Sequence, residues 1–322
     1  MSEVKQSAKQ PRLVILTGPT AVGKTDLSIA LAKRIGGEII SADSMQVYRH
    51  MDIGSAKIMP DEMDGIPHHL IDVLEPAEEF NVVSFQQMAK QAMDGIYDRG
   101  RIPIVTGGTG FYIQALLYDI DFTDNDEDTA LRRKLEEIAK TQGSEVLYER
   151  LKSIDPESCE IIHANNIKRV IRAIEFYEKT GMKISDHNKM QRQNSSPYNF
   201  AYFVLNDDRD KLYRKIEERV DTMMTQGLVD EVQRLADSGC TRDMVSMQGL
   251  GYKEILDYLD GQTTLEEAVY RIKRDTRHFA KRQLTWFRRE RDTIMINKPE
   301  YAYNNDRMID YLLKVLQEKG II

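Results

Sequence analysis

The chain has 322 residues, of which 41% are hydrophobic, and its 45 basic and 52 acidic side chains give a formal net charge of −7. This composition supports a large core in one to three domains and excludes binding of nucleic acid through overall positive charge. With only Cys159 and Cys240, a disulfide framework is excluded. The N-terminus is polar and no run reaches the roughly 20 apolar residues that span a bilayer, which predicts a cytoplasmic protein without membrane association.

The first third of the chain alternates short apolar runs with helical patterns. Runs at Leu13–Leu16, Glu38–Ser41 and Ile102–Val105 predict buried strands. Between them, residues 27–35 and 85–97 place apolar side chains at helical spacing. Strands that alternate with helices are typical of a parallel sheet with helices on both faces.

The character of the sequence changes near Asp119, where six acids fall within residues 119–128 and predict a solvated linker. Beyond it the pattern is helical. One face is expected to hold Leu131, Leu135 and Ile138, and another Ile167, Val170, Ile171 and Ile174. Residues 121–196 are therefore predicted to form a helical insertion domain, and residues 10–120 and 197–322 an α/β core.

The core resumes with a predicted strand at Tyr202–Leu205. A long amphipathic helix is expected from Asp210, with Leu212, Ile216, Val220, Met223 and Leu228 on one side. Residues 265–289 and 306–318 predict two further helices, and Thr293–Ile296 predicts a last strand.

A phosphate-binding loop follows the first predicted strand and precedes the first helix. Its residues are Gly18, Pro19, Thr20, Ala21, Val22, Gly23, Lys24 and Thr25, which match G-x-x-x-x-G-K-[ST]. Backbone N–H groups and the helix N-terminus would surround phosphate oxygens, Lys24 would add a full charge, and Thr25 could place its hydroxyl on Mg²⁺. The motif does not distinguish ATP or GTP from other diphosphates.

Two further loops follow predicted strands. Asp43 comes after the second strand, where a carboxylate could act as a general base, a metal partner or a helix N-cap, and spacing alone leaves these open. Thr109 lies within Gly107–Tyr112 after the third strand, where three glycines allow a close approach of the backbone to a ligand. No clear strand ending in the Asp that ATPases use was found, which argues against ATP hydrolysis.

A basic stripe lies between Arg271 and Arg289, where eight Lys or Arg residues surround the only tryptophan, Trp286. Such a stripe suits a phosphate backbone and stacked bases. From the residues alone, a solvated helix face with Trp286 in the core is the favoured alternative.

Together, six blocks resemble the bacterial tRNA dimethylallyltransferases. They are GPTAVGKT, SADSMQVYRHMDIGSAK, PHHLIDVLEP, GGTGFY, QGLGYKE and KRQLTWFR, in that order, and they cover the chain from about Leu13 to Arg289. Val22 departs from the Ser that members often have in the P-loop. Two lone cysteines exclude the zinc module of eukaryotic members and imply the bacterial form.

The resemblance implies a P-loop NTPase-like parallel sheet flanked by helices, with an all-helical insertion domain that reaches the anticodon arm. It implies transfer of a dimethylallyl group from dimethylallyl diphosphate to the exocyclic amine of the adenosine on the 3′ side of the tRNA anticodon. Mg²⁺ is the implied cofactor, the anticodon stem-loop of tRNA the implied partner, and a monomer the expected state.

The resemblance also assigns roles to residues. Asp43 would be the base, Arg219 would assist at the diphosphate with Lys24 and Thr25, and the P-loop would hold a diphosphate in place of a nucleotide. The residues expected to contact tRNA are Asp43, Ser44, Met45, Gln46, Thr109, Lys168, Arg169, Arg172, Gln248, Gly249, Gly251, Lys253, Lys281, Arg282, Trp286 and Arg288.

Three rivals remain at this stage. An adenylate isopentenyltransferase would share the P-loop and Asp43 but would not need the helical insertion or the basic stripe. A small-molecule P-loop kinase would not combine the Asp43 and Thr109 blocks. A non-catalytic RNA-binding protein would not need an intact Lys24, Thr25 and Asp43.

Overall fold

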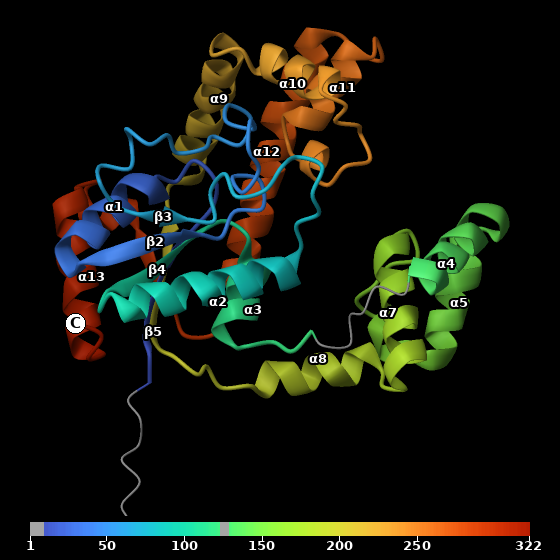
Figure 1. Cartoon of the computed structure of the whole chain (residues 1–322), viewed down its shortest axis with the longest axis horizontal. Coiled ribbons are helices and arrows are strands. Elements are labelled where there is room, and N and C mark those ends of the chain that lie inside the picture. Colours follow the sequence, from blue (N-terminus) through green and yellow to red (C-terminus); the bar gives the residue numbers. More distant parts are fainter. Residues whose placement is uncertain (1–9, 123–128) are drawn as a thin grey trace, which may run out of the picture. The chain divides into compact units, whose positions relative to one another are not determined.

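The computed structural model describes residues 10–122 and 129–322, which divide into two compact units (Figure 1). One unit comprises the chain up to Leu117 together with Pro197–Ile322, and the other comprises Tyr118–Ser196. The second unit thus begins slightly before the boundary predicted at residue 121. Residues 123–128 of the expected acidic linker lie outside the described residues. Within the described ranges, no helix combines the length and apolar character needed to cross a bilayer.

The larger unit is built on six parallel strands in the order β3-β2-β4-β1-β5-β6. Their bounds are β1 Arg12–Thr17, β2 Gly37–Ser41, β3 His68–His69, β4 Ile102–Gly107, β5 Asn199–Asn206 and β6 Thr293–Asn297. All five predicted strands are confirmed, and the sequence missed β3, which is too short to show a period. The central β1 pairs on both sides, so that Val14 lies opposite Ile104 and Ala201.

Helices cover the sheet because successive side chains of a buried strand point to opposite faces. Val14 and Leu16 of β1 share one core with α1 (Lys24–Ile35) and α13 (Asn305–Glu318). The helix α2 (Val82–Asp98) contacts β2 and β4, and α3 (Gly110–Leu117) packs on α2. The predicted parallel sheet with flanking helices is therefore present.

The chain after β5 forms α9 (Arg209–Thr225), α10 (Leu228–Asp237), the 3₁₀ turn η1 (Ser246–Gln248), α11 (Tyr252–Leu259) and α12 (Leu265–Phe287). The prediction of one continuous helix from Asp210 through Leu228 was wrong. Gly227 has a φ of 96°, which breaks the helix, and Leu228 begins α10. The 3₁₀ turn η2 (Lys298–Tyr301) follows β6.

The unit Tyr118–Ser196 is helical, with α4 Thr129–Gln142, α5 Ser144–Ile154, α6 Pro156–Cys159, α7 Ile167–Thr180 and α8 Ile184–Gln193. Its core includes Leu135, Val170, Ile171 and Ile174, as the periodicity predicted. Ile167 was expected on that face, but it is 37% exposed because it occupies the first turn of α7, next to the Asn166 cap.

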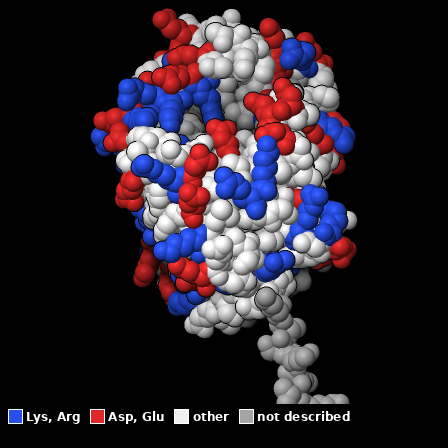
Figure 2. Space-filling model, turned by 90° about the vertical axis from the view of Figure 1, so that its left-hand side faces the viewer, with Lys and Arg blue, Asp and Glu red and all other residues white. Residues whose placement is uncertain are grey.

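Charge is distributed over the surface without a single dominant sign on the face that Figure 2 presents. Acidic and basic side chains are interspersed there, which agrees with a composition of 45 bases and 52 acids. A nucleic-acid site on this face would therefore depend on a local arrangement of cations.

Candidate active site at the carboxyl edge of the sheet

The three motif loops follow neighbouring strands of the sheet. The P-loop follows β1, the segment from Ala42 follows β2, and the loop with Thr109 follows β4, which lies between the other two strands. The Ala42 N–H donates to the Thr106 carbonyl at 2.7 Å, and the Thr109 N–H donates to the Ala42 carbonyl at 3.2 Å. Since parallel strands end at one edge, Lys24, Asp43 and Thr109 lie on loops at the same edge of the sheet.

Two glycines of the P-loop adopt backbone conformations that residues with a side chain rarely adopt, and one of them also lacks space for a Cβ. Gly18 has a φ of 151°, and a Cβ there would come within 2.6 Å of the Leu205 carbonyl oxygen. Gly23 has a φ of 91° and immediately precedes α1. The Lys24 ammonium donates to the carbonyls of Gly18 at 3.0 Å and Pro19 at 2.8 Å, so it lies across the loop where phosphate oxygens would bind.

Lys24, Arg219 and Asp43 influence one another electrostatically. The pKa of Lys24 is lowered to about 8, mainly because the surrounding protein displaces water from the ammonium group. The positive charge of Arg219 lowers this pKa further, whereas the negative charge of Asp43 raises it. Displacement of water also lowers the pKa of Arg219, although its side chain still reaches solvent, and Asp43 again opposes the shift. The structure thus brings Arg219 from α9 to the two groups with which the sequence grouped it.

Asp43 uses one carboxylate oxygen to fix its own loop. Its Oδ1 accepts from the backbone N–H groups of Met45 at 2.8 Å and Gln46 at 3.4 Å. The N-cap interpretation is therefore half correct, because Asp43 caps a turn and no helix follows. No hydrogen bond to Oδ2 occurs within the described residues. Residues 43–46 are all partly exposed, which leaves them accessible at this edge of the sheet.

The glycines at the end of β4 and at the start of α3 bring the backbone against other protein atoms. A Cβ on Gly107 would lie 2.3 Å from the Ala42 carbonyl oxygen, and one on Gly110 would lie 2.3 Å from a ring carbon of Trp286. The close approach was predicted toward a ligand, whereas the observed close contacts are with the Asp43 loop and with α12. Thr109 itself is partly exposed between these two contacts.

The QGLGYKE block lies directly against the Asp43 loop. A Cβ on Gly249 would lie 2.6 Å from the terminal methyl of Met45, and Gly251 has a φ of 97° at the start of α11. Glu231 of α10 is 2% exposed and accepts the backbone N–H groups of residues 52–54 and the Tyr252 hydroxyl, at 2.8 to 3.0 Å. This buried carboxylate therefore joins α10 and α11 to the segment that follows Asp43.

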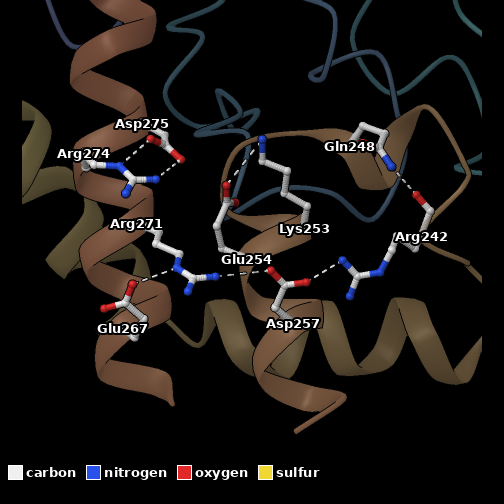
Figure 3. Close-up of a pocket in the computed structure, with 9 residues that line it drawn as sticks. All are labelled: Arg242, Gln248, Lys253, Glu254, Asp257, Glu267, Arg271, Arg274 and Asp275. Atoms are coloured by element: carbon white, nitrogen blue, oxygen red, sulfur yellow. Dashed lines mark hydrogen bonds and ion pairs between the residues drawn. The ribbon is translucent and has the colours of Figure 1, made fainter. Parts of the chain in front are cut away.

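A charged pocket of about 450 Å³ lies between α11 and α12 (Figure 3). Its lining includes two of the expected tRNA contacts, Gln248 and Lys253. Four cations line it, and each has a carboxylate partner: the pairs are Arg242–Asp257, Lys253–Glu254, Arg271–Glu267 and Arg274–Asp275. The pocket is therefore neutralised internally.

The basic stripe on α12 divides into two halves. In the first half, Arg271, Lys273, Arg274 and Arg277 are all paired with carboxylates. In the second half, which continues past the end of α12 at Phe287, Lys281, Arg282, Arg288 and Arg289 have no carboxylate partner among the described residues. The first half fits the solvated-face interpretation, and only the second half offers cations that a phosphate backbone could use.

Trp286 lies at the surface beside the unpaired cations. It is 36% exposed and meets the ring of Phe111 edge-on, with centroids 6.3 Å apart. The alternative that placed Trp286 in the core was wrong. Trp286 and several of these cations line a shallow pocket of about 440 Å³. The lining residues are His278, Lys281, Arg282, Thr285, Trp286 and Arg289.

The remaining expected tRNA contacts belong to the helical unit Tyr118–Ser196. Lys168 and Arg169 are exposed on the first turn of α7. Arg172 is partly buried, and the pKa of its guanidinium is lowered by burial and then by the neighbouring Arg132. Exposure makes Lys168 and Arg169 available to a partner, while Arg172 lies deeper within its own unit.

Sequence reasoning missed two residues near the P-loop. Gln283 of α12 forms hydrogen bonds with both the P-loop and the loop after β4. The sequence did contain a sign of this role, because Gln283 is a polar residue at an inward position of the helix between Ala280 and Phe287. The second missed residue is Asp207, which directly follows β5, the strand that pairs with β1. It is an Asp at the end of a strand, the feature of ATPases that sequence reasoning did not find. Its Oδ2 lies 2.9 Å from the Lys215 ammonium, so this carboxylate is already neutralised.

A P-loop beside a carboxylate and an arginine is typical of enzymes that act on a phosphorylated ligand. Two family models match the sequence: IPP transferase over residues 46–290 and isopentenyl transferase over residues 11–75. The chain belongs to the IPP transferase family.

Similar proteins cover most of the chain. A protein of Lachnoclostridium phytofermentans named tRNA dimethylallyltransferase is 62% identical over 311 residues, which cover 96% of this chain and 99% of that protein. The structure of a full-length tRNA isopentenylpyrophosphate transferase from Bacillus halodurans is 44% identical, covers 97% and 98% of the two chains, and has a TM-score of 0.72. A eukaryotic dimethylallyltransferase acting on tRNA is 31% identical, covers 89% and 74%, and has a TM-score of 0.77.

Proposed function

We propose that this chain transfers the dimethylallyl group of dimethylallyl diphosphate to the exocyclic amine of the adenosine on the 3′ side of the tRNA anticodon, and releases diphosphate. The observation that carries the proposal is the convergence of Lys24, Arg219 and Asp43 at one edge of the sheet. Its tRNA-modifying relatives, similar over almost the entire chain, support the same reaction.

The reaction needs stabilisation of a leaving group and removal of one proton. The amine nitrogen forms a bond to the allylic carbon while the bond from that carbon to the diphosphate oxygen breaks. Negative charge then grows on the diphosphate, where the P-loop N–H groups, Lys24 and Arg219 would stabilise it. The same groups would serve a phosphoryl transfer equally well, so the P-loop alone does not define the chemistry.

Asp43 is suited to accept the proton that the amine loses as it attacks. Its Oδ1 is engaged by Met45 and Gln46, which fixes the carboxylate in one orientation and leaves Oδ2 for the substrate. Ser44, Met45, Gln46 and Thr109 are partly exposed around it and would line the path of a base flipped out of the RNA.

Mg²⁺ fits the residues at the start of α1. The Thr25 hydroxyl is exposed at the end of the P-loop, and no group of three metal-ligating side chains occurs among residues 10–122 and 129–322. Such a site suits an ion shared between one protein hydroxyl, the diphosphate and water. When bound, the ion would add positive charge beside the leaving group.

The RNA would lie on the unpaired half of α12. Lys281, Arg282 and Arg288 supply phosphate contacts there, and Trp286 supplies an exposed ring for stacking. We place the reaction in the cytoplasm, where tRNA is available, and assign the chain as a monomer.

An assay with two acceptors tests the proposal. Radiolabelled dimethylallyl diphosphate and Mg²⁺ are incubated with the chain and either unmodified bacterial tRNA or free AMP. Label on tRNA alone is expected. Label on AMP would instead support an adenylate isopentenyltransferase, and ATP turnover without transfer of label would support a P-loop kinase.

A further inference from the structure

Gln283 is a polar residue in the apolar, inward-facing row of α12. Ala280 and Phe287, one turn away on either side, are 0% exposed, and Gln283 is 6% exposed. Its neighbours Lys281 and Arg282 face outward. Burial of an amide is unfavourable unless both its donor and its acceptor are satisfied. The position therefore suggests a specific role for both ends of the side chain.

Both ends of the Gln283 amide bind loops of the proposed active site. Its Oε1 accepts the Thr20 backbone N–H at 2.9 Å, and its Nε2 donates to the Gly108 carbonyl at 2.9 Å. A Cβ on Gly108 would lie 2.1 Å from Nε2, so the glycine is needed for this approach. One rigid amide thus spans the P-loop and the loop that leads to Thr109.

We propose that Gln283 is a positioning residue that sets the separation between the diphosphate-binding loop and the loop beside the acceptor base. The inference rests on the proposed function, because those two loops then carry the electrophile and the nucleophile. Gln283 need touch neither substrate, since it acts through Thr20 and Gly108. Because it lies among the cations expected to bind RNA, it also links that surface of α12 to the P-loop.

The expected effect is on the rate of transfer more than on binding. Reacting atoms must be held about 3–3.5 Å apart, and a displacement of about 1 Å can cost about 10²-fold in rate. Gln283→Met keeps the length of the side chain but removes both hydrogen bonds. We expect its single-turnover rate to fall by about 10–10²-fold, while the Kd values for tRNA and for inorganic diphosphate change by less than about threefold.

A glutamate at this position provides a readout that loss of packing alone would not produce. In Gln283→Glu, an ionised carboxylate still accepts from Thr20 but repels the Gly108 carbonyl, whereas a protonated carboxyl can donate to it. The rate of Gln283→Glu relative to the native chain should therefore rise as the pH is lowered toward the raised pKa of a buried glutamic acid. The relative rate of Gln283→Met should stay flat.

The experiment is single-turnover transfer from labelled dimethylallyl diphosphate to tRNA, measured for the native chain, both Gln283 variants and Gln87→Met. Gln87 is exposed on α2 and serves as the matched control. A rate for Gln283→Met equal to that of Gln87→Met, with only a lower melting temperature, would overturn the positioning role. If the native chain itself transfers no label to tRNA, the proposed function fails, and the inference fails with it.

Discussion

The division of α12 into paired and unpaired cations leads to a quantitative prediction about RNA binding. Each phosphate contact contributes about 0.7 to 0.9 to the slope of log K against log salt concentration. Lys281 and Arg282 have no carboxylate partner among the described residues, so each would replace counterions of the RNA. Changing both to Gln should reduce the slope by about 1.4 to 1.8.

A second double variant on the same helix serves as the control. Lys273 and Arg277 lie one or two turns earlier and are paired with Asp221 and Glu217 of α9. Their conversion to Gln removes the same net charge, but these cations already have protein counterions. The slope should therefore remain within about 0.5 of the native value.

The measurement is filter binding of an anticodon stem-loop over a series of salt concentrations. Circular dichroism melting of each variant identifies any loss of folding. Equal reductions in slope for the two double variants would refute the reasoning, because overall charge would then explain binding as well as local availability. An unchanged slope for Lys281→Gln/Arg282→Gln would indicate that the entire basic stripe is a solvated helix face that does not bind RNA.

Three other predictions follow from individual side chains. Asp43→Asn keeps the acceptor for the Met45 N–H but removes the base, so single-turnover transfer should fall by about 10²–10⁴-fold; weaker tRNA binding with unchanged chemistry would contradict this role. The ratio of the native Kd for diphosphate to that of Lys24→Arg, measured by calorimetry, should be constant below pH 8 and rise by up to about tenfold per pH unit above it, because Lys24 with its pKa of about 8 must then take up a proton. A ratio that stays constant above pH 8 would contradict this role of Lys24. Glu38→Gln should lower the free energy of unfolding by about 2 kcal/mol at neutral pH. The reason is that hydrogen bonds from Arg99, and then from His69, hold the pKa of Glu38 at about 2, although burial of the carboxylate acts to raise it. That difference should fade in denaturation curves as the pH falls from about 4.5 toward 2, and a difference that persists in acid would rule out the ion pair as its source.

The parts of the fold that local sequence determines could be predicted. The P-loop was identifiable because a buried run, two glycines and a helical pattern follow one another within a short segment. The strands β1, β2, β4, β5 and β6 were found from their apolar runs. The two-residue β3 and the break at Gly227 were missed, because a strand of two residues has no period and a single glycine inside a helical pattern does not always end a helix.

The parts of the site that depend on distant residues could not be predicted from patterns. Arg219 was placed with Lys24 only through the family resemblance, since nothing in its own helix points to the P-loop. Two of the four paired cations of α12 use acids on α9 that are far away in sequence, namely Lys273 with Asp221 and Arg277 with Glu217. A charge run alone therefore cannot separate cations that are already neutralised from those that can bind RNA.

The most direct test of the central claim is to locate the transferred group on the RNA. The native chain, dimethylallyl diphosphate and Mg²⁺ are incubated with an anticodon stem-loop, which is then digested and analysed by mass spectrometry. The account predicts one prenylated adenosine, on the 3′ side of the anticodon, and no product from an identical stem-loop with a purine that lacks the exocyclic amine at that position. Prenylation at another nucleotide, or an equal yield from the RNA without the amine, would contradict the account.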